Sequence, residues 1–111
     1  MMKEIKKINA ALAPLTVVHR MEFKTNLESG KCSLVLELVD DDIEPIAGII
    51  LEAGLVSDFW VKGFGGGVTQ ILCLRVRDVR HLQHDGVKYV LEDLENQAFN
   101  LKCMSLIVRK S

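Results

Sequence analysis

The chain has 111 residues, of which 49% are hydrophobic, and its formal net charge is −1. This length fits one domain, residues 1–111, and the hydrophobic content excludes intrinsic disorder. The near-zero charge gives no global reason to bind nucleic acid or an anionic membrane, and the longest apolar run, Ile46 to Val56, is too short to span a bilayer.

The first predicted element is a short amphipathic helix over Lys3 to Leu12. Ile5 and Ile8 recur at helical spacing with Leu12, and Pro14 ends the segment. Lysines before a mildly apolar stretch superficially resemble a secretion signal, but that stretch is too short, so we reject a signal peptide. We therefore expect a soluble, cytoplasmic protein.

The chain has three cysteines, Cys32, Cys73 and Cys103, which lie far apart inside apolar runs. Reduced cysteines in such positions behave as small hydrophobic side chains. Because no C-x-x-C pair anchors a zinc site, we predict neither a metal site nor a catalytic cysteine.

The hydrophobic period changes to two after the helix. Val17 to Lys24 alternates, with His19 on its apolar side, and predicts a half-buried strand. Glu28 to Lys31 supplies turn residues, and Cys32 to Val39 alternates again. These two strands are expected to pair as a hairpin.

Two later segments fit either a helix or a strand. Glu44 to Gly54 has a helical stripe after Pro45, but Gly48 and the isoleucines favour a buried strand, which we prefer. Val87 to Glu95 is expected to pair with Phe99 to Arg109 as the last hairpin, although its leucines also permit a helix.

The segments between them complete the predicted fold. Phe59 to Phe64 is short and aromatic, Val68 to Val79 alternates as a strand, and Arg80 to Gly86 is a loop. Six or seven strands result. The sequence therefore predicts a mainly β (α+β) fold, either an antiparallel sheet or a small sandwich, with the N-terminal helix on one edge or face.

The glycine-rich segment Gly63 to Gly67 resembles a phosphate-binding loop. A dinucleotide-binding loop needs glycine where Val68 stands and a helix directly after it, but a strand-like pattern follows. A hairpin loop or bulge is the preferred interpretation.

The segment Arg80 to Asp85 is the chemically densest. His81 and His84 share a metal if they lie on one helical turn, but no third ligand is evident nearby. An alternative function follows: a small-ligand or metal-binding protein with a pocket where this segment meets the glycine-rich loop. The ligand-binding candidates are Gly65, Gly66, Arg75, Arg77, His81, His84 and Asp85.

Arg75 and Arg77 share one face of a predicted strand. Neighbouring carboxylates neutralise such a face by cross-strand pairing, so we prefer a charged solvent face to nucleic-acid binding. The basic residues that would extend it are Arg80, Lys102, Arg109 and Lys110.

Phe59 and Trp60 are adjacent, so on a strand they point to opposite faces. At least one lies outside a single-layer core, and tryptophan is enriched at binding hot spots. The chain has only one tryptophan, which makes this region the best sequence indication of an interface. The interface candidates are Phe59, Trp60 and Phe64.

Four segments of the C-terminal part of the chain form a recognisable pattern: Thr69-Gln70-Ile71, Val76-Arg77-Asp78-Val79, Tyr89 to Asn96 and Phe99 to Cys103. With this pattern, the stretch from Ile49 to Val108 resembles small uncharacterised bacterial proteins of immunity-protein or mobile-cassette type. The resemblance implies a mostly β fold and a binding role, and it identifies no functional residue.

The leading functional hypothesis is a small non-enzymatic interaction protein. It binds a protein partner or itself, as a homo-oligomer, through a complementary patch. We expect no catalytic residue, no cofactor and no metal ion.

Overall fold

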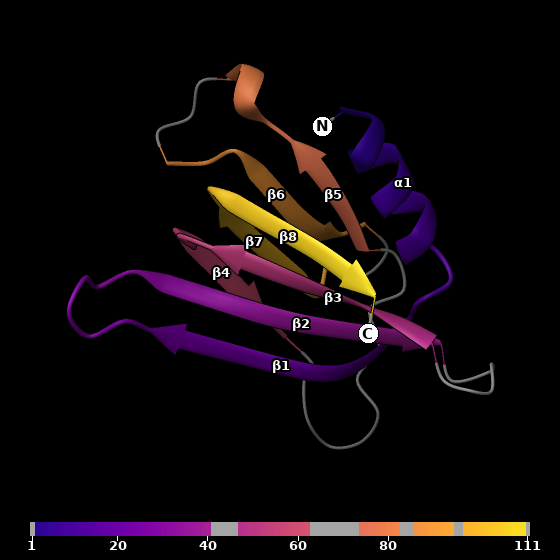
Figure 1. Ribbon diagram of the computed structural model, residues 1–111, viewed down its shortest axis with the longest axis horizontal. Helices are drawn as coiled ribbons and strands as arrows, with labels where there is room; N and C mark the ends of the chain where they lie inside the picture. Colours follow the sequence, from indigo (N-terminus) through magenta and orange to yellow (C-terminus); the bar gives the residue numbers. More distant parts are fainter. Residues whose placement is uncertain (1, 41–46, 63–73, 83–85, 95–96, 111) are drawn as a thin grey trace.

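The computed structural model describes residues 2–40, 47–62, 74–82, 86–94 and 97–110. These residues form one α-helix and eight strands, arranged as two antiparallel four-stranded sheets (Figure 1). The helix and strands are α1 (Met2–Leu12), β1 (Val17–Thr25), β2 (Cys32–Asp40), β3 (Ala47–Gly54), β4 (Asp58–Val61), β5 (Leu74–Asp78), β6 (Tyr89–Asp93), β7 (Phe99–Cys103) and β8 (Ser105–Lys110). A short 3₁₀ turn, η1 (Arg80–Leu82), follows β5.

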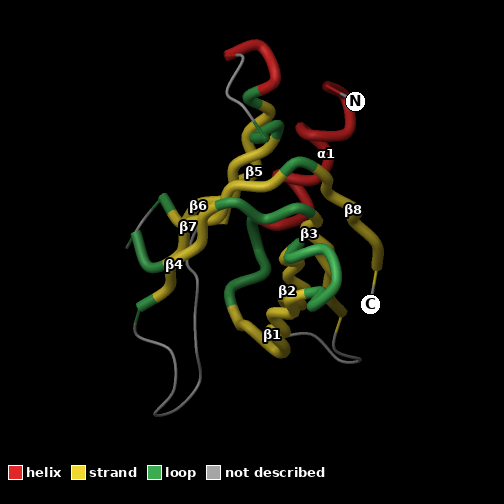
Figure 2. The backbone as a smooth tube through the Cα atoms, turned by 90° about the vertical axis from the view of Figure 1, so that its left-hand side faces the viewer, coloured by secondary structure: helices red, strands yellow, loops and turns green. Residues whose placement is uncertain are grey.

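The strand order is β1-β2-β3-β8 in the first sheet, called sheet 1, and β4-β7-β6-β5 in the second, called sheet 2. Figure 2 shows the strands of the two sheets as separate groups. The predicted mainly β fold with an N-terminal helix is confirmed. Of the two predicted arrangements, a single sheet or a small sandwich, the structure has the sandwich. The described residues contain eight strands, one more than the largest number predicted.

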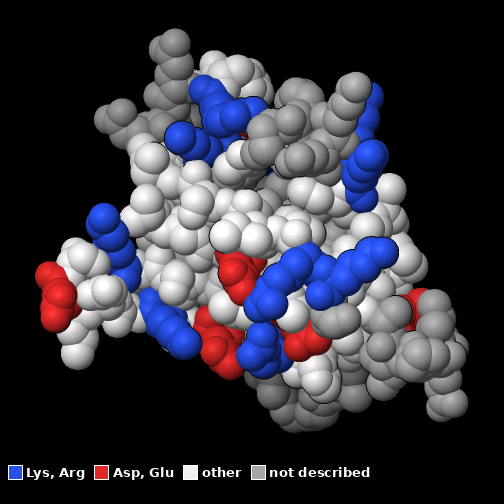
Figure 3. Space-filling model, viewed as in Figure 1, with Lys and Arg blue, Asp and Glu red and all other residues white. Residues whose placement is uncertain are grey.

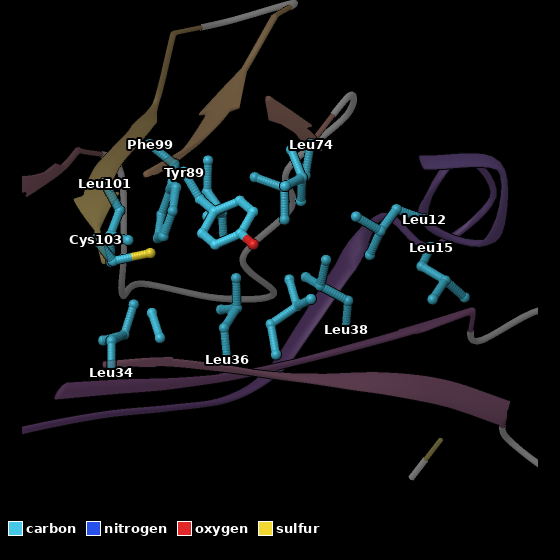
Figure 4. Packing of buried hydrophobic residues seen from close by; sticks show 14 residues of the cluster. Leu12, Leu15, Leu34, Leu36, Leu38, Leu74, Tyr89, Phe99, Leu101 and Cys103 are labelled. Carbon is cyan, nitrogen blue, oxygen red and sulfur yellow. The ribbon is translucent and has the colours of Figure 1, made fainter. Parts of the chain in front are cut away.

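The core lies between the two sheets. Leu34, Leu36 and Leu38 of β2 are each at most 1% exposed, as their alternation predicts. They face side chains of sheet 2, including Leu101 and Cys103, which are fully buried (Figure 4).

Helix α1 closes one side of the sandwich. Leu12 is buried in the core, and Ile5 and Ile8 pack against it, which confirms the predicted apolar stripe. The side chain of Asn9 reaches the free edge of β5: its Nδ2 donates to the Val76 carbonyl at 3.0 Å, and its Oδ1 accepts from the Val76 N–H at 2.8 Å. One amide side chain thus takes the place of a neighbouring strand.

Both ambiguous segments contain strands. Within Glu44 to Gly54 the strand is β3, which begins at Ala47, and within Val87 to Glu95 it is β6. The predicted hairpins also form, since β1 pairs with β2 and β6 with β7.

The predicted position of His19 on the apolar face of its strand is wrong. The register of β1 against β2 shifts between Val18 and Arg20, and His19 at this irregularity is exposed. Val18 before the shift and Met21 after it both pack against the core. An extra residue in the strand therefore changes which positions point inward.

The prediction of one strand from Phe99 to Arg109 is also wrong. The chain leaves sheet 2 after Cys103 and enters sheet 1 at Ser105, so β7 and β8 belong to different layers. Leu101 is buried and Leu106 packs against the same core, so the inward positions slip by one residue at the crossing. This break accounts for the additional strand.

Candidate functional site on the outer face of sheet 2

Phe59 and Trp60 lie side by side on β4, where adjacent side chains point to opposite faces. The ring of Phe59 stacks on Phe23 of β1, with ring centroids 5.5 Å apart, and meets Phe99 of β7 edge-on at 5.6 Å. Phe59 is half-buried and packs against the core. It therefore contributes to the interior, and Trp60 lies on the outer face of sheet 2.

Trp60 keeps 44% of its surface exposed. Nζ of Lys62 lies 5.9 Å from the centroid of its ring, which is a cation–π distance. The strand register places three further side chains in one row with Trp60 across the sheet. They are Asn100, Glu92 and Arg75.

A second row on the same face runs from Asp58 through Lys102 and Val90 to Arg77. Val90 is only 5% exposed although it lies on this face. We call these two rows, with Lys62, the Trp60 face. Its members are Asp58, Trp60, Lys62, Arg75, Arg77, Val90, Glu92, Asn100 and Lys102.

The Trp60 face carries an excess of positive charge. Four of its members are lysine or arginine and two are acidic, although the whole chain has a net charge of −1. Nε of Arg77 lies 2.7 Å from Oε1 of Glu92, so this pair is neutralised within the sheet. The remaining cations outnumber the remaining carboxylate, Asp58.

The outer face of sheet 1 differs from the Trp60 face. It faces the viewer in Figure 3, where acidic and basic side chains are interspersed. Arg20 lies 3.2 Å from Glu22 and 3.6 Å from Glu37, and Arg109 lies 2.7 Å from Glu52. These charges are paired with one another, either within β1 or across neighbouring strands.

Arg80 is held in place by Asp78 at the end of β5. Its Nε and Nη2 donate to the carboxylate at 2.6 to 3.0 Å, and its backbone N–H donates at 3.1 Å. These hydrogen bonds, above all those from the Arg80 side chain, hold the pKa of Asp78 below its ordinary value. Cζ of Arg80 also lies 5.9 Å from the ring centroid of Tyr89. Arg80 therefore has a local structural role.

The basic residues considered together from the sequence are divided between the sheets. Arg75, Arg77 and Lys102 share the Trp60 face, whereas Arg109 and Lys110 lie on β8 of sheet 1. The fold therefore does not gather them into one patch.

Of the histidine segment, His81 lies exposed in η1. Within the ranges that the structure describes, no three His, Cys, Asp or Glu side chains come together as a metal site. The proposed pocket between this segment and the glycine-rich loop stays a prediction. The candidate residues that lie outside the described residues are Phe64, Gly65, Gly66, His84 and Asp85.

A hollow of about 330 Å³ lies between α1 and the edge of β5. It joins the Trp60 face at Arg75, which belongs to both, and Lys6 adds a second cation on the helix side. The basic surface thus continues around the edge of sheet 2. The residues that line the hollow are Lys6, Asn9, Ala10, Ala13, Leu74 and Arg75.

The thiol of Cys103 is fully buried, and desolvation raises its pKa to about 12. A thiol with this pKa stays protonated at neutral pH, and only the thiolate is a nucleophile. Cys103 acts as the small hydrophobic side chain predicted from its sequence context.

Four residues of the Trp60 face are not site candidates from the sequence alone: Asp58, Lys62, Val90 and Asn100. The alternation of β7 carried a signal, because it sets Asn100 and Lys102 opposite the apolar side chains. What the sequence lacked was the pairing of β4 with β7, which brings Trp60 next to Asn100.

The chain matched no protein-family model, no curated protein and no solved structure in the comparisons made. Among the described residues, none of the helices has both the length and the apolar character needed to cross a membrane.

Proposed function

We propose that this protein is a small binding protein that contacts an acidic protein partner through the Trp60 face. The observation that carries the proposal is the placement of the only tryptophan, 44% exposed, on a sheet face with an excess of cations. A solvent-exposed tryptophan in a soluble domain costs hydrophobic free energy, and burial in an interface recovers it.

The chemistry of the face supports a partner with an apolar pocket and acidic rim. Trp60 supplies the large rigid anchor that interface hot spots favour, and Asn100 beside it supplies hydrogen-bonding groups. Lys62 and Lys102 flank this centre and favour carboxylates on the partner. The resemblance to immunity-type and mobile-cassette proteins supports the same role.

A protein fits the face better than a nucleic acid. Binding along a phosphate backbone relies on several cations that release counterions together. Here Asp58 and Glu92 stand among the cations, and Glu92 already neutralises Arg77. This mixed pattern favours an acidic protein, whose carboxylates can lie opposite the unpaired cations and away from Asp58, over a continuous phosphate backbone.

The cytoplasm is the proposed compartment. Cys32 and Cys103 are free thiols, which is the usual state of cysteines in a reducing compartment.

The test is affinity capture from cells of the source organism, followed by measurement of the Kd for the purified partner. Trp60→Ala is expected to weaken binding roughly 30-fold or more, as loss of a hot spot does. Leu27→Ala is the matched control, because Leu27 is 94% exposed in the β1–β2 turn of sheet 1. It is expected to bind as tightly as the wild type.

Trp60→Ala should cost the fold less than about 1 kcal/mol, since the side chain is half exposed. An unchanged Kd for Trp60→Ala would refute the proposal. Capture that disappears after nuclease treatment would replace the protein partner with a nucleic acid on the same face.

A further inference from the structure

The described residues form two four-stranded sheets, whose edge strands are β1, β8, β4 and β5. An edge strand presents unpaired N–H and C=O groups that another chain can pair with, so proteins protect such edges. The four edges of this protein differ in how they are protected.

Three edges carry a recognisable protection. The edge of β5 is occupied by Asn9, which hydrogen-bonds both backbone groups of Val76. Strand β4 is only four residues long. Strand β1 carries the irregularity next to Val18 and charged side chains at alternate positions, Arg20, Glu22 and Lys24, of which Arg20 and Glu22 lie 3.2 Å apart.

Strand β8 has no irregularity, and its charges lie only at its end, at Arg109 and Lys110. It is six residues long and pairs with β3 in an uninterrupted register, and no described residue pairs with its other side. Its first four residues, 105–108, carry no charge. Ile107 is 58% exposed on the outer face, and the inward-facing Leu106 and Val108 are only half-buried.

We propose that β8 is a homodimerisation edge, which pairs antiparallel with β8 of a second copy to form a continuous eight-stranded sheet. Paired residues in antiparallel strands share a face, so outward Ile107 must meet an outward residue. Centring the pair on Ile107 sets it opposite the partner's Ile107. Leu106 then faces the partner's Val108, and Ser105 faces the partner's Arg109.

This register is favourable on both faces. The two half-buried inward side chains, Leu106 and Val108, cover each other and extend the core across the interface. Arg109 meets a small neutral side chain, so like charges are kept apart. The outer face of sheet 2 takes no part, so the dimer displays two Trp60 faces, and the inference is independent of the proposed function.

The test is the mass in solution, measured by light scattering over a concentration series. The wild type is expected to rise from 12.4 kDa to twice that mass. Ile107→Lys and Ile107→Glu each place like charges opposite one another at the two-fold axis, and each is expected to raise the dimer Kd roughly tenfold or more. An equimolar mixture of the two is expected to restore the dimer.

Leu27→Lys is the matched control and should dimerise as the wild type does, as should Trp60→Ala. Thermal melting checks that both Ile107 variants are folded. A dimer that forms in the mixture shows independently that they are folded. A wild type that stays at 12.4 kDa at high concentration would overturn the inference. So would an Ile107→Lys variant that remains dimeric, or a mixture that remains monomeric.

Discussion

Cys103 shows how burial in the sandwich changes the chemistry of one side chain. The thiol is fully buried between Leu101 and the leucines of β2, and its pKa rises from 9.0 to about 12 because the thiolate is desolvated. The folded protein therefore holds this proton over a pH range in which the unfolded chain releases it.

This shift predicts a loss of stability in alkali. The contribution of the neutral thiol is complete below pH 9 and is lost as the pH rises towards 12, at about 1.4 kcal/mol per pH unit. Urea denaturation at pH 8 and pH 10.5 measures it as the difference between the wild type and Cys103→Ala. If the free energy of unfolding falls equally in the two proteins between pH 8 and pH 10.5, deprotonation of Cys103 is not the cause.

At the scale of elements, α1 stabilises sheet 2 by occupying the edge of β5. Asn9→Ala removes both hydrogen bonds to Val76 and leaves that edge open, at an expected cost of about 1–3 kcal/mol in the free energy of unfolding. Asn9→Asp is the matched variant, because it keeps the acceptor for the Val76 N–H but sets a carboxylate against the Val76 carbonyl.

Hydrogen exchange of the Val76 amide, with chemical denaturation, measures this prediction. We expect faster exchange in Asn9→Ala than in the wild type. Equal exchange rates and equal stability would mean that the edge is held by other contacts.

The elements were largely predictable from alternation, and the failures have a common cause. The β1–β2 and β6–β7 hairpins follow from clean period-two patterns with turn residues between them. The irregularity at His19 and the crossing at Met104 each slip the pattern by one residue. After such a slip the opposite set of alternating residues points inward, and where the slip falls depends on the partner strand.

At the scale of the whole molecule, long-range pairings decide which side chains become a surface. The sequence indicated that Trp60 and Phe59 separate, and that Arg75 and Arg77 share a face. It did not indicate that β4 joins β7, or that Asn9 reaches Val76, 67 positions away. These contacts depend on the order of strands, which local patterns do not encode.

The whole molecule is therefore a sandwich with two different outer faces. Sheet 1 pairs its charges internally, and sheet 2 presents Trp60 among excess cations. The central claim is that this second face binds an acidic protein partner.

Site-specific photo-cross-linking in cells of the source organism tests this claim most directly. A photoreactive phenylalanine analogue replaces Asp58, an exposed neighbour of Trp60 on the same face, in one variant and Leu27 in the other. We predict one discrete protein adduct at position 58 that is missing at position 27. No adduct at position 58, or the same adducts at both positions, would contradict the account.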